Sequence, residues 1–539
     1  MTTTRSRAAA LCLGLALASC GSDGGGSSGG GVAVVPAPSP SPTVAASSLS
    51  VSLTPMQSNL RGYDDNSDVA LTIEATRAGT TTDAVIPDVQ YDRTKLSIPD
   101  GIEAGSDGRY TIRAHTARGL ALGRYSGELT FRLCRDAGCA SVYPGTTQTA
   151  SYTLDVSMRE WSMFQRNPAH TGYVHASFSP AAFRRAWEWA PAAYRLSPAS
   201  SHDGMAMVTA YNRDGTTSVH ALDIATGAQR WGYNLGQVHF ASGPAIGNGR
   251  VFLTTMTVSS DENRIVTLDA ATGEFRSPVM LFSAQWSFFL PPTPFDTSLY
   301  MSAGYQGNTV YGFDIAAQTQ WSVAGEGAGI WDGETPAVDD RYAYYYAGKA
   351  MVLIDRRTGQ VKEAMADPFF QGSGSSYYGA PILAPSSGLV LAYAGTRGSA
   401  SSSPLAAWAP GSGLRWRSAD AYVTTPAVTN GMIYLARNQP SRLDALREAS
   451  GAPVWSWTPP ADERFIGNTI ATDTLVFVST DKAVYAIAID DPAHPVAWSA
   501  PTPGAMAITA DGTLLVTQEM PLEYSSSTMP QKLVAYRLR

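Results

Sequence analysis

Charged residues are scarce in this sequence. Only 15% of its 539 residues are Asp, Glu, Lys or Arg, and the formal net charge is −7. The Lys and Arg residues are scattered without a basic run, which argues against the phosphate-binding stripe of a nucleic-acid binder and against a polybasic membrane patch. We therefore expect no nucleic-acid partner.

Histidine is also rare. The chain has seven His, and none forms a His-Glu-x-x-His phrase or a His pair, so zinc catalysis has no visible site. The stretch from Gly26 to Gly30 matches Gly-x-Ser-x-Gly, but it lies among Gly and Ser residues where no strand or helix could hold a nucleophile. We name no catalytic residue and expect no metal.

A hydrophobic run long enough to span a membrane is missing from the N-terminal region. The apolar stretch Ala8 to Ala18, preceded by Arg5 and Arg7, has the length of a secretory signal. It ends in Leu17-Ala18-Ser19-Cys20, which resembles the lipobox of bacterial lipoproteins. The resemblance implies that residues 1–20 form the signal and that the Cys20 thiol is acylated. The alternative is an ordinary cleaved signal in which Cys20 is incidental.

Residues 21–48 are mostly Gly, Ser, Ala and Pro and cannot form a core, so we expect a flexible tether. As a random coil it would hold the folded part roughly 30 Å from the membrane. By resemblance to lipoprotein sorting in diderm bacteria, Gly21 after the acylated Cys favours the outer membrane. The expected location is therefore the outer membrane, with the lipid anchor as the sole membrane contact.

Cysteine is nearly absent from the folded part. Of four Cys, Cys12 would be lost with the signal and Cys20 acylated, which leaves Cys134 and Cys139. These two flank a turn-like Arg-Asp-Ala-Gly sequence between two apolar runs, so we expect a disulfide across a hairpin in an oxidising compartment. Two Cys without neighbouring His do not supply the four ligands of a structural metal site.

Residues 49–157 alternate apolar and polar side chains in short runs. Examples are Leu49 to Leu53, Val69 to Ile73, Arg109 to Arg113 and Ser151 to Val156. Such period-two runs separated by turns predict an immunoglobulin-like β-sandwich.

Residues 160–539 repeat at a period of roughly 40 residues, which is typical of solenoids and propellers. The clearest copy runs from Ser218 to Trp231 and contains a strand, Asp223, a Thr226-Gly227 turn and a second strand ending in Trp. It recurs from Ile265 to Phe275 and from Met351 to Val361, and weaker copies reach Trp416, Trp455 and Trp498. The pattern resembles the pyrroloquinoline-quinone-type propeller repeat.

Inner-strand phrases such as Gly243-Pro244-Ala245-Ile246 give eight repeat units. The last unit lacks the strand that ends in Trp, and an orphan strand of that kind lies at Phe183 to Trp189. The predicted fold is all-β: an immunoglobulin-like sandwich followed by an eight-bladed propeller closed by its N- and C-terminal strands. Quinone-using members of the repeat family carry a vicinal Cys pair and calcium ligands, but this propeller has no Cys, so we expect no cofactor.

The segments before the inner strands should converge on one face of the propeller, and they are rich in aromatic residues. These side chains either pack loops against the rim or form a recognition face, because Trp, Tyr and Arg carry much of the binding energy at interfaces. The candidate binding residues are Phe240, Trp286, Phe288, Trp331, Asp332, Tyr377, Tyr378, Arg464 and Phe465.

The sequence therefore predicts a non-enzymatic envelope lipoprotein that binds a protein partner. It resembles the propeller lipoproteins of the outer-membrane β-barrel assembly machine, although the added sandwich departs from them. The alternative is a glycan-binding protein or a hydrolase that uses the aromatic face, with Asp332 and Glu334 as candidate acid or base.

Overall fold

The fold is that of a computed structural model, which describes residues 49–539 except 64–68, 118–119, 121, 239, 257–263, 281–290, 304–308, 325–334, 347, 371–379, 396–401 and 519–530. The regular secondary structure of the described residues consists of β-strands and one short 3-10 helix, η1 (Pro180–Ala182). The prediction of an all-β protein is confirmed. Cys20 and the residues 21–48 lie outside the described residues.

Residues 50–157 form two sheets. One has the order β1 (Ser50–Thr54), β3 (Val69–Ala78), β7 (Arg109–Thr116), β5 (Leu96–Ser97), and β6 (Ile102–Ala104) also pairs with β7. The other has the order β2 (Gln57–Tyr63), β9 (Gln148–Ser157), β8 (Gly123–Cys134), β4 (Ile86–Tyr91), with β2 parallel to β9. Both sheets contribute to a single buried cluster that includes Ile73, Ile112, Phe131 and Leu154.

The strands of these two sheets alternate as the sequence predicts. In β7 every second residue is buried, because successive side chains of a strand point to opposite faces of the sheet. The first strands of the region divide between the two sheets, and β2 runs alongside the last strand, β9. On this strand order we propose that residues 50–157 are an immunoglobulin-like sandwich.

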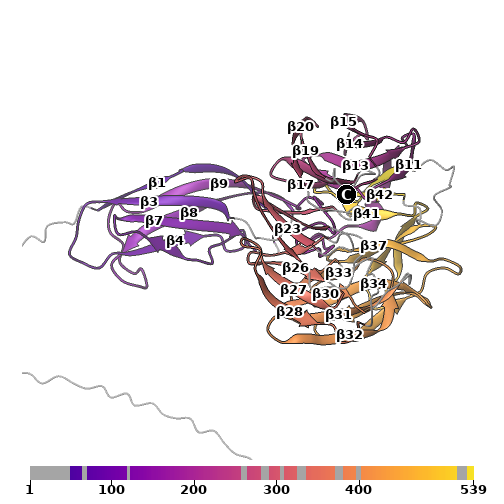
Figure 1. The fold of residues 1–539 in the computed structure, drawn as a ribbon. Helices are drawn as coiled ribbons and strands as arrows, with labels where there is room; N and C mark the ends of the chain where they lie inside the picture. The colour runs from indigo at the N-terminus through magenta and orange to yellow at the C-terminus, as the bar shows by residue number, and fades with distance from the viewer. Residues whose placement is uncertain are drawn as a thin grey trace, which may run out of the picture. The chain divides into compact units, whose positions relative to one another are not determined.

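The remaining described strands form eight antiparallel sheets arranged as the blades of a propeller (Figure 1). We number the blades 1 to 8 in chain order. Blade 1 is β11 (Ala193–Leu196) and β12 (Ser200–His202), both paired with β13 (Met205–Asn212), then β14 (Thr217–Asp223) and β15 (Gln229–Gly236). Blade 2 is β16 (Phe240–Ala241) and β17 (Ala245–Gly247), both paired with β18 (Arg250–Met256), then β19 (Arg264–Asp269) and β20 (Phe275–Met280).

Blades 3 to 7 each have four consecutive strands, which run in chain order from the inner to the outer position. They are β21 (Thr293–Phe295), β22 (Ser298–Ala303), β23 (Thr309–Asp314), β24 (Thr319–Ala324); β25 (Ala337–Val338), β26 (Tyr342–Tyr346), β27 (Ala350–Asp355), β28 (Val361–Ala366); β29 (Ile382–Ala384), β30 (Leu389–Tyr393), β31 (Ser403–Ala409), β32 (Gly413–Tyr422); β33 (Ala427–Thr429), β34 (Met432–Asn438), β35 (Ser441–Arg447), β36 (Pro453–Trp457); and β37 (Phe465–Ala471), β38 (Leu475–Thr480), β39 (Val484–Ala488), β40 (Val496–Ala500).

Blade 8 is the seam of the ring. Its inner strands are β41 (Ala505–Ile508), β42 (Thr513–Thr517) and β43 (Leu533–Arg537), and its outer strand is β10 (Arg184–Trp189), which comes from before blade 1. β10 pairs antiparallel with β43, with Trp189 opposite Leu533. The predicted pairing of the N-terminal strand with the last strand of the chain is therefore present.

In blades 1, 2 and 4 the repeated Asp and Gly shape the turn before the outer strand. In blade 1 the Asp223 carboxylate accepts a hydrogen bond from the Thr226 backbone N–H at 2.9 Å, and Gly227 takes a φ of +74°. The hydrogen bond from the Arg230 side chain is the main cause of the lowered pKa of Asp223. Thr272 and Thr358 donate in the same way to Asp269 and Asp355. The signature residues thus have a structural role.

The repeated Trp joins one blade to the next. Trp231 of blade 1 lies over Gly273 of blade 2 and donates its Nε1–H to the Ala270 carbonyl at 3.1 Å. Trp321 and Trp416 make the same contacts with the following blades. At the seam, Trp187 of β10 lies over Gly227 and donates to the Ile224 carbonyl at 2.7 Å, so the ring closes with the joint used elsewhere.

Candidate functional site

Most of the predicted binding residues belong to segments that lead from an outer strand into the next inner strand. Trp286, Phe288, Trp331, Asp332, Tyr377 and Tyr378 lie outside the described residues, as does Glu334. Phe240 is the first residue of β16. The aromatic face therefore stays a prediction at these positions.

Arg464 and Phe465 stand in the described connection between blades 6 and 7, and the structure separates them. The Arg464 side chain is exposed, whereas Phe465 is only 2% exposed and packs in a cluster with Tyr434, Val476 and Tyr485. Adjacent residues at the start of a strand point to opposite faces, so one reaches solvent and the other the core. The expectation that Phe465 lies on a binding face is wrong.

An open groove of about 450 Å³ lies beside Arg464. Its walls come from the hairpin between β34 and β35 and from the connection into β37, and they include Asn438, Pro459, Pro460 and Asp462. Below it Glu463 accepts hydrogen bonds from Thr480 at 2.6 Å and from Tyr485 at 3.0 Å. Burial, followed by the hydrogen bond to Glu463, raises the pKa of Tyr485 to about 12. These hydrogen bonds fix the carboxylate of Glu463, which lines the groove.

Blade 1 carries a second described surface on β11, its first strand. Tyr194 is 44% exposed and lies 6.2 Å, ring to ring, from Tyr211. The Arg195 guanidinium lies 5.5 Å from the Tyr211 ring centre, and the Tyr211 hydroxyl donates to the Ala241 carbonyl of blade 2. This patch has the aromatic and cationic character that the sequence predicts for the face.

The inner ends of the blades surround residues 158–178, which we call the axial segment. Its Trp161, Met163, Gln165 and Val174 side chains are all buried. Ser201 of blade 1 donates its backbone N–H to the Trp161 carbonyl at 2.8 Å, and Val428 of blade 6 donates to the Thr171 carbonyl at 2.8 Å. The described axis is therefore filled by the chain itself.

Polar side chains fix the axial segment across the ring. Gln165 donates from Nε2 to the Pro426 carbonyl at 2.7 Å and accepts from Asn468 at 2.8 Å. His170 is 0% exposed, donates from Nδ1 to the Pro381 carbonyl at 2.8 Å and meets Phe164 edge to face at 5.1 Å. Burial lowers the pKa of His170 to about 4, so its ring is neutral at pH 7. Sequence reasoning missed this segment entirely.

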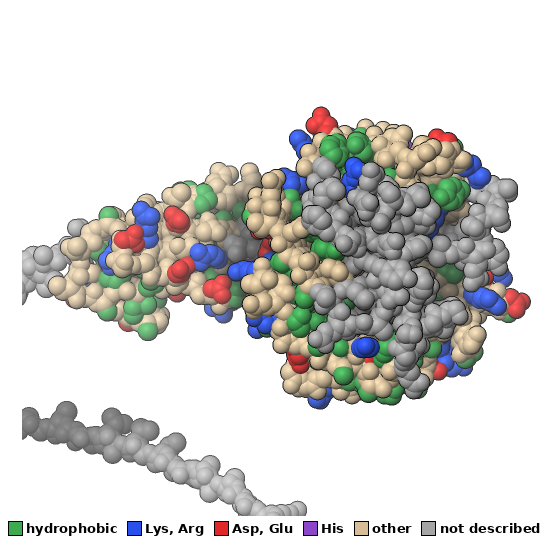
Figure 2. Space-filling view, in the orientation of Figure 1, with side chains coloured by type: hydrophobic (Ala, Val, Ile, Leu, Met, Phe, Trp, Pro, Cys, Tyr) green, Lys and Arg blue, Asp and Glu red, His purple; other side chains and the backbone are tan. Residues whose placement is uncertain are grey.

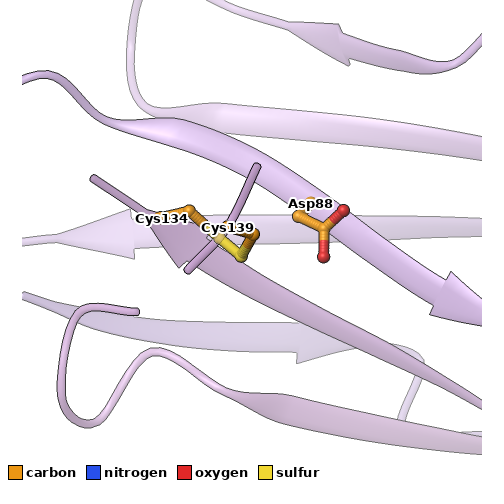
Figure 3. A group of neighbouring side chains, drawn as sticks. All are labelled: Asp88, Cys134 and Cys139. Carbon is orange, nitrogen blue, oxygen red and sulfur yellow. A yellow bond between two sulfur atoms is a disulfide. The ribbon is translucent and has the colours of Figure 1, made fainter. Parts of the chain in front are cut away.

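Among the described residues, one group of side chains could in principle bind a metal ion, and it lies in the sandwich. It consists of Asp88, Cys134 and Cys139 (Figure 3). The two Cys sulfurs are joined as a disulfide with a Cα–Cα distance of 5.1 Å. Asp88 accepts a hydrogen bond from Arg132 at 2.7 Å. These three residues are therefore engaged in protein contacts, and thiolate ligands would require reduction.

On the face drawn in Figure 2, described side chains of both charge signs are scattered and do not gather into one patch. A face of this kind does not generate the strong single-sign potential that steers a highly charged ligand. In the part of the chain that the structure describes, no helix is long and apolar enough to cross a membrane.

Comparisons with known proteins show what the repeats are similar to. Residues 215–457 match the family model described as outer membrane protein assembly factor BamB. The repeats in this range are of the PQQ type and resemble those of BamB. No curated protein matches the chain.

Solved structures show distant likenesses. BamB from Moraxella catarrhalis is 17% identical, with a TM-score of 0.48 over 66% of this chain and 99% of that one. AztD from Citrobacter koseri is 11% identical, with a TM-score of 0.39 over 56% and 85%. Hsv2 from Kluyvelomyces marxianus is 8% identical, with a TM-score of 0.37 over 56% and 98%.

Proposed function

We propose that this chain is an outer-membrane lipoprotein whose propeller binds an envelope protein without catalysing a reaction. The Cys20 thiol carries the lipid, residues 21–48 form the tether, and the disulfide-bonded sandwich and the propeller follow it in the chain. The lipobox-like sequence supports the anchor. The family model, which is described as an outer membrane protein assembly factor, supports the kind of partner.

The filled axis is the observation that carries the proposal. Small-molecule sites are concave and bury most of their ligand, and the axis of a propeller would be the natural place for one. In this chain the axial segment takes up the hydrogen-bonding groups of the inner strands. Binding is thereby directed to the broad face formed by the connections into the inner strands, where Tyr194 and Arg464 are exposed.

A face of this kind suits a protein partner. Protein interfaces bury roughly 800 Å² on each partner and are anchored by a few Tyr, Trp and Arg side chains. Tyr194 lies at the start of the first strand of blade 1, and Arg464 directly precedes the first strand of blade 7, so we place the patch and the groove at the same end of the ring. Trp286, Trp331 and Tyr377 belong to equivalent connections by sequence.

The test is quantitative capture of envelope proteins by the full chain and by face variants. Trp286→Ala, Trp331→Ala and Arg464→Ala should unfold at the wild-type temperature and capture less of the protein that the wild type retains. Phe275→Ala is the matched control, because Phe275 is 47% exposed on the outer strand of blade 2, away from these connections. Strong destabilisation of the Trp variants with capture intact would make them core residues and refute the face.

The same variants separate the glycan-binding alternative. They are applied to an oligosaccharide array next to the wild type. A wild-type signal that disappears in Trp286→Ala, combined with unchanged protein capture, would replace the protein-binding scaffold by a glycan-binding site. Release of shortened sugars from that array would identify a hydrolase.

A further inference from the structure

Six backbone N–H groups at equivalent positions of the inner strands point to the axial segment. They belong to Ser201, Ile246, Val338, Leu383, Val428 and Ala471, in blades 1, 2, 4, 5, 6 and 7. Each donates to a carbonyl of the axial segment, at 2.7 to 3.0 Å. An inner strand is a sheet edge, and these groups would otherwise be unpaired.

The acceptors follow the order of the blades. They are the carbonyls of Trp161, Ser162, Pro168, Ala169, Thr171 and Gly172 for blades 1, 2, 4, 5, 6 and 7 in turn. The segment therefore winds around the inside of the ring in the direction of the chain.

Blade 3 makes no backbone hydrogen bond of this kind to the axial segment. The equivalent position there is Pro294, which has no N–H to donate. Thr293 lies beside it with its Oγ1 at 3.3 Å from His170 Nε2. The blade without the backbone donor is thus contacted through a side chain.

The path of the segment depends on these contacts. Gln165, Arg166 and His170 adopt φ values of +47°, +80° and +59°, in the left-handed region that non-glycine residues seldom adopt. Gly172, at +59°, would place a Cβ 2.7 Å from Gln165 Nε2 and 3.2 Å from the Thr469 carbonyl. Several unfavourable conformations in one short stretch persist only where the surroundings fix them.

We propose that the inner wall of the propeller is a peptide-binding surface and that its ligand is the axial segment of the same chain. The recognised chemistry is a curved peptide that presents successive carbonyls outward, with a buried Trp161 near its start and a neutral His170 at its centre. The segment binds without needing to be continuous with the blades. It holds blades 1 to 7, while β10 completes blade 8.

Cutting the full chain between the axial segment and β10 tests the proposal. Ser177, Ser179 and Ala181 are exposed, so a protease site inserted after Ser179 is accessible. After cleavage, the fragment with the sandwich and axial segment should co-elute with the ring in gel filtration and separate in denaturant. A second chain carries the site between Ala190 and Ala192, which are exposed, and it controls for the effect of a chain cut that leaves β10 on the N-terminal fragment.

Two further results decide the interpretation. Gly172→Val in the first cut chain should release the N-terminal fragment at lower denaturant than the cut chain without it, whereas His175→Ala should not. In the uncut chain, hydrogen exchange of peptides covering residues 161–174 should be as slow as that of the strands, although this stretch forms no strand. Separation of the fragments from a ring that stays folded, or fast exchange of residues 161–174, would overturn the proposal.

Discussion

Gly227→Ala tests the joint that closes the ring. Gly227 has a φ of +74°, and a Cβ added there would lie 2.7 Å from Cδ2 of Trp187, the Trp supplied by β10. Gly413→Ala is the matched control. It ends the equivalent turn of blade 5, as the first residue of β32, with a φ of +75°, and an added Cβ would meet nothing within 4 Å. The preceding outer strand, in blade 4, has Glu363 at the position that Trp187 takes in blade 8.

The two variants share one cost and differ in another. Ala in the left-handed region costs about 1–2 kcal/mol at either position. Only Gly227→Ala must also displace a packed Trp, which costs about 1–3 kcal/mol, and weaken its hydrogen bond to Ile224, which is worth about 1 kcal/mol. The free energy of unfolding should therefore fall by about 2–4 kcal/mol more in Gly227→Ala than in Gly413→Ala.

Urea unfolding of the full chain, followed by Trp fluorescence and far-ultraviolet circular dichroism, measures this difference. The same substitutions in a Trp187→Ala background complete a double-mutant cycle. Without the Trp187 ring, Gly227→Ala should cost no more than Gly413→Ala. Equal destabilisation in the wild-type background, or additivity in the cycle, would show that Trp187 does not lock blade 8 onto blade 1.

Three further predictions concern the anchor, the disulfide and the axis. Cys20→Ser removes the acyl attachment point, so the protein should move from the membrane fraction to the soluble fraction; unchanged partition would refute the lipid anchor. Replacing Cys134 and Cys139 by Ser should lower the free energy of unfolding by about 2 kcal/mol, because the closed loop is short, and unchanged stability with or without reductant would contradict a formed disulfide. His170 has a folded pKa of about 4, below its usual 6.5. Between these two pKa values the unfolded chain binds a proton that the folded chain does not. The free energy of unfolding should therefore fall by about 3 kcal/mol as the pH falls from 6.5 towards 4, and His170→Gln should show a smaller fall over that range.

The repeats could be predicted because their information is local and recurs. The turn at Asp223 to Gly227, the Trp that follows and the inner-strand phrases appear several times, so each copy supports the others. The closing strand could be inferred in the same way, since the last repeat lacks a strand and Phe183 to Trp189 has its pattern. The observed pairing of β10 with β43 matches that inference.

The axial segment could not be predicted for a physical reason. It occurs once, so no periodicity reveals it, and it contains no alternating run. Its main contacts use backbone carbonyls, which every residue has, and its side-chain contacts join residues as far apart as Gln165 and Asn468. The signal that could have found it is the combination of Trp161, Phe164 and His170 in a stretch that fits neither strand nor tether.

The candidate site was predictable in location and not in detail. The rule that connections into inner strands meet at one end of the ring placed Arg464 at an exposed groove. The same rule wrongly included Phe465. It could not determine which of two adjacent residues, Arg464 or Phe465, has its side chain in the core at the start of β37. A shift of one residue exchanges the core and solvent faces of a strand.

The joints between blades show how the repeat encodes the ring. Where the outer strand has Trp231, Trp416 or Trp187, the residue opposite it on the neighbouring strand is Ala, and opposite Trp321 it is Gly312. In blades 2 and 4 the equivalent positions hold Ser277 and Glu363, and the residues opposite are Thr267 and Leu353.

The turn residue of the following blade also varies with the residue at the Trp position. In blades 1, 2, 4 and 6 the turn residue under the Trp of the preceding blade is a Gly with a positive φ, whereas in blade 7 it is His494, which stacks on Trp455 at 4.1 Å. In blade 3, whose preceding blade has Ser277, this position holds Gln318 with a φ of +54°, and Gly413 of blade 5 has no ring above it. A Trp on the outer strand thus goes with a small residue opposite it on the adjacent strand, and at four joints with a Gly in the turn of the next blade. A Trp introduced at another joint therefore needs changes at both of these positions. Installing Trp at Ser277 should destabilise the propeller unless Thr267→Ala and Gln318→Gly accompany it, and recovery of the unfolding midpoint in the triple variant is the measurement that would establish this code.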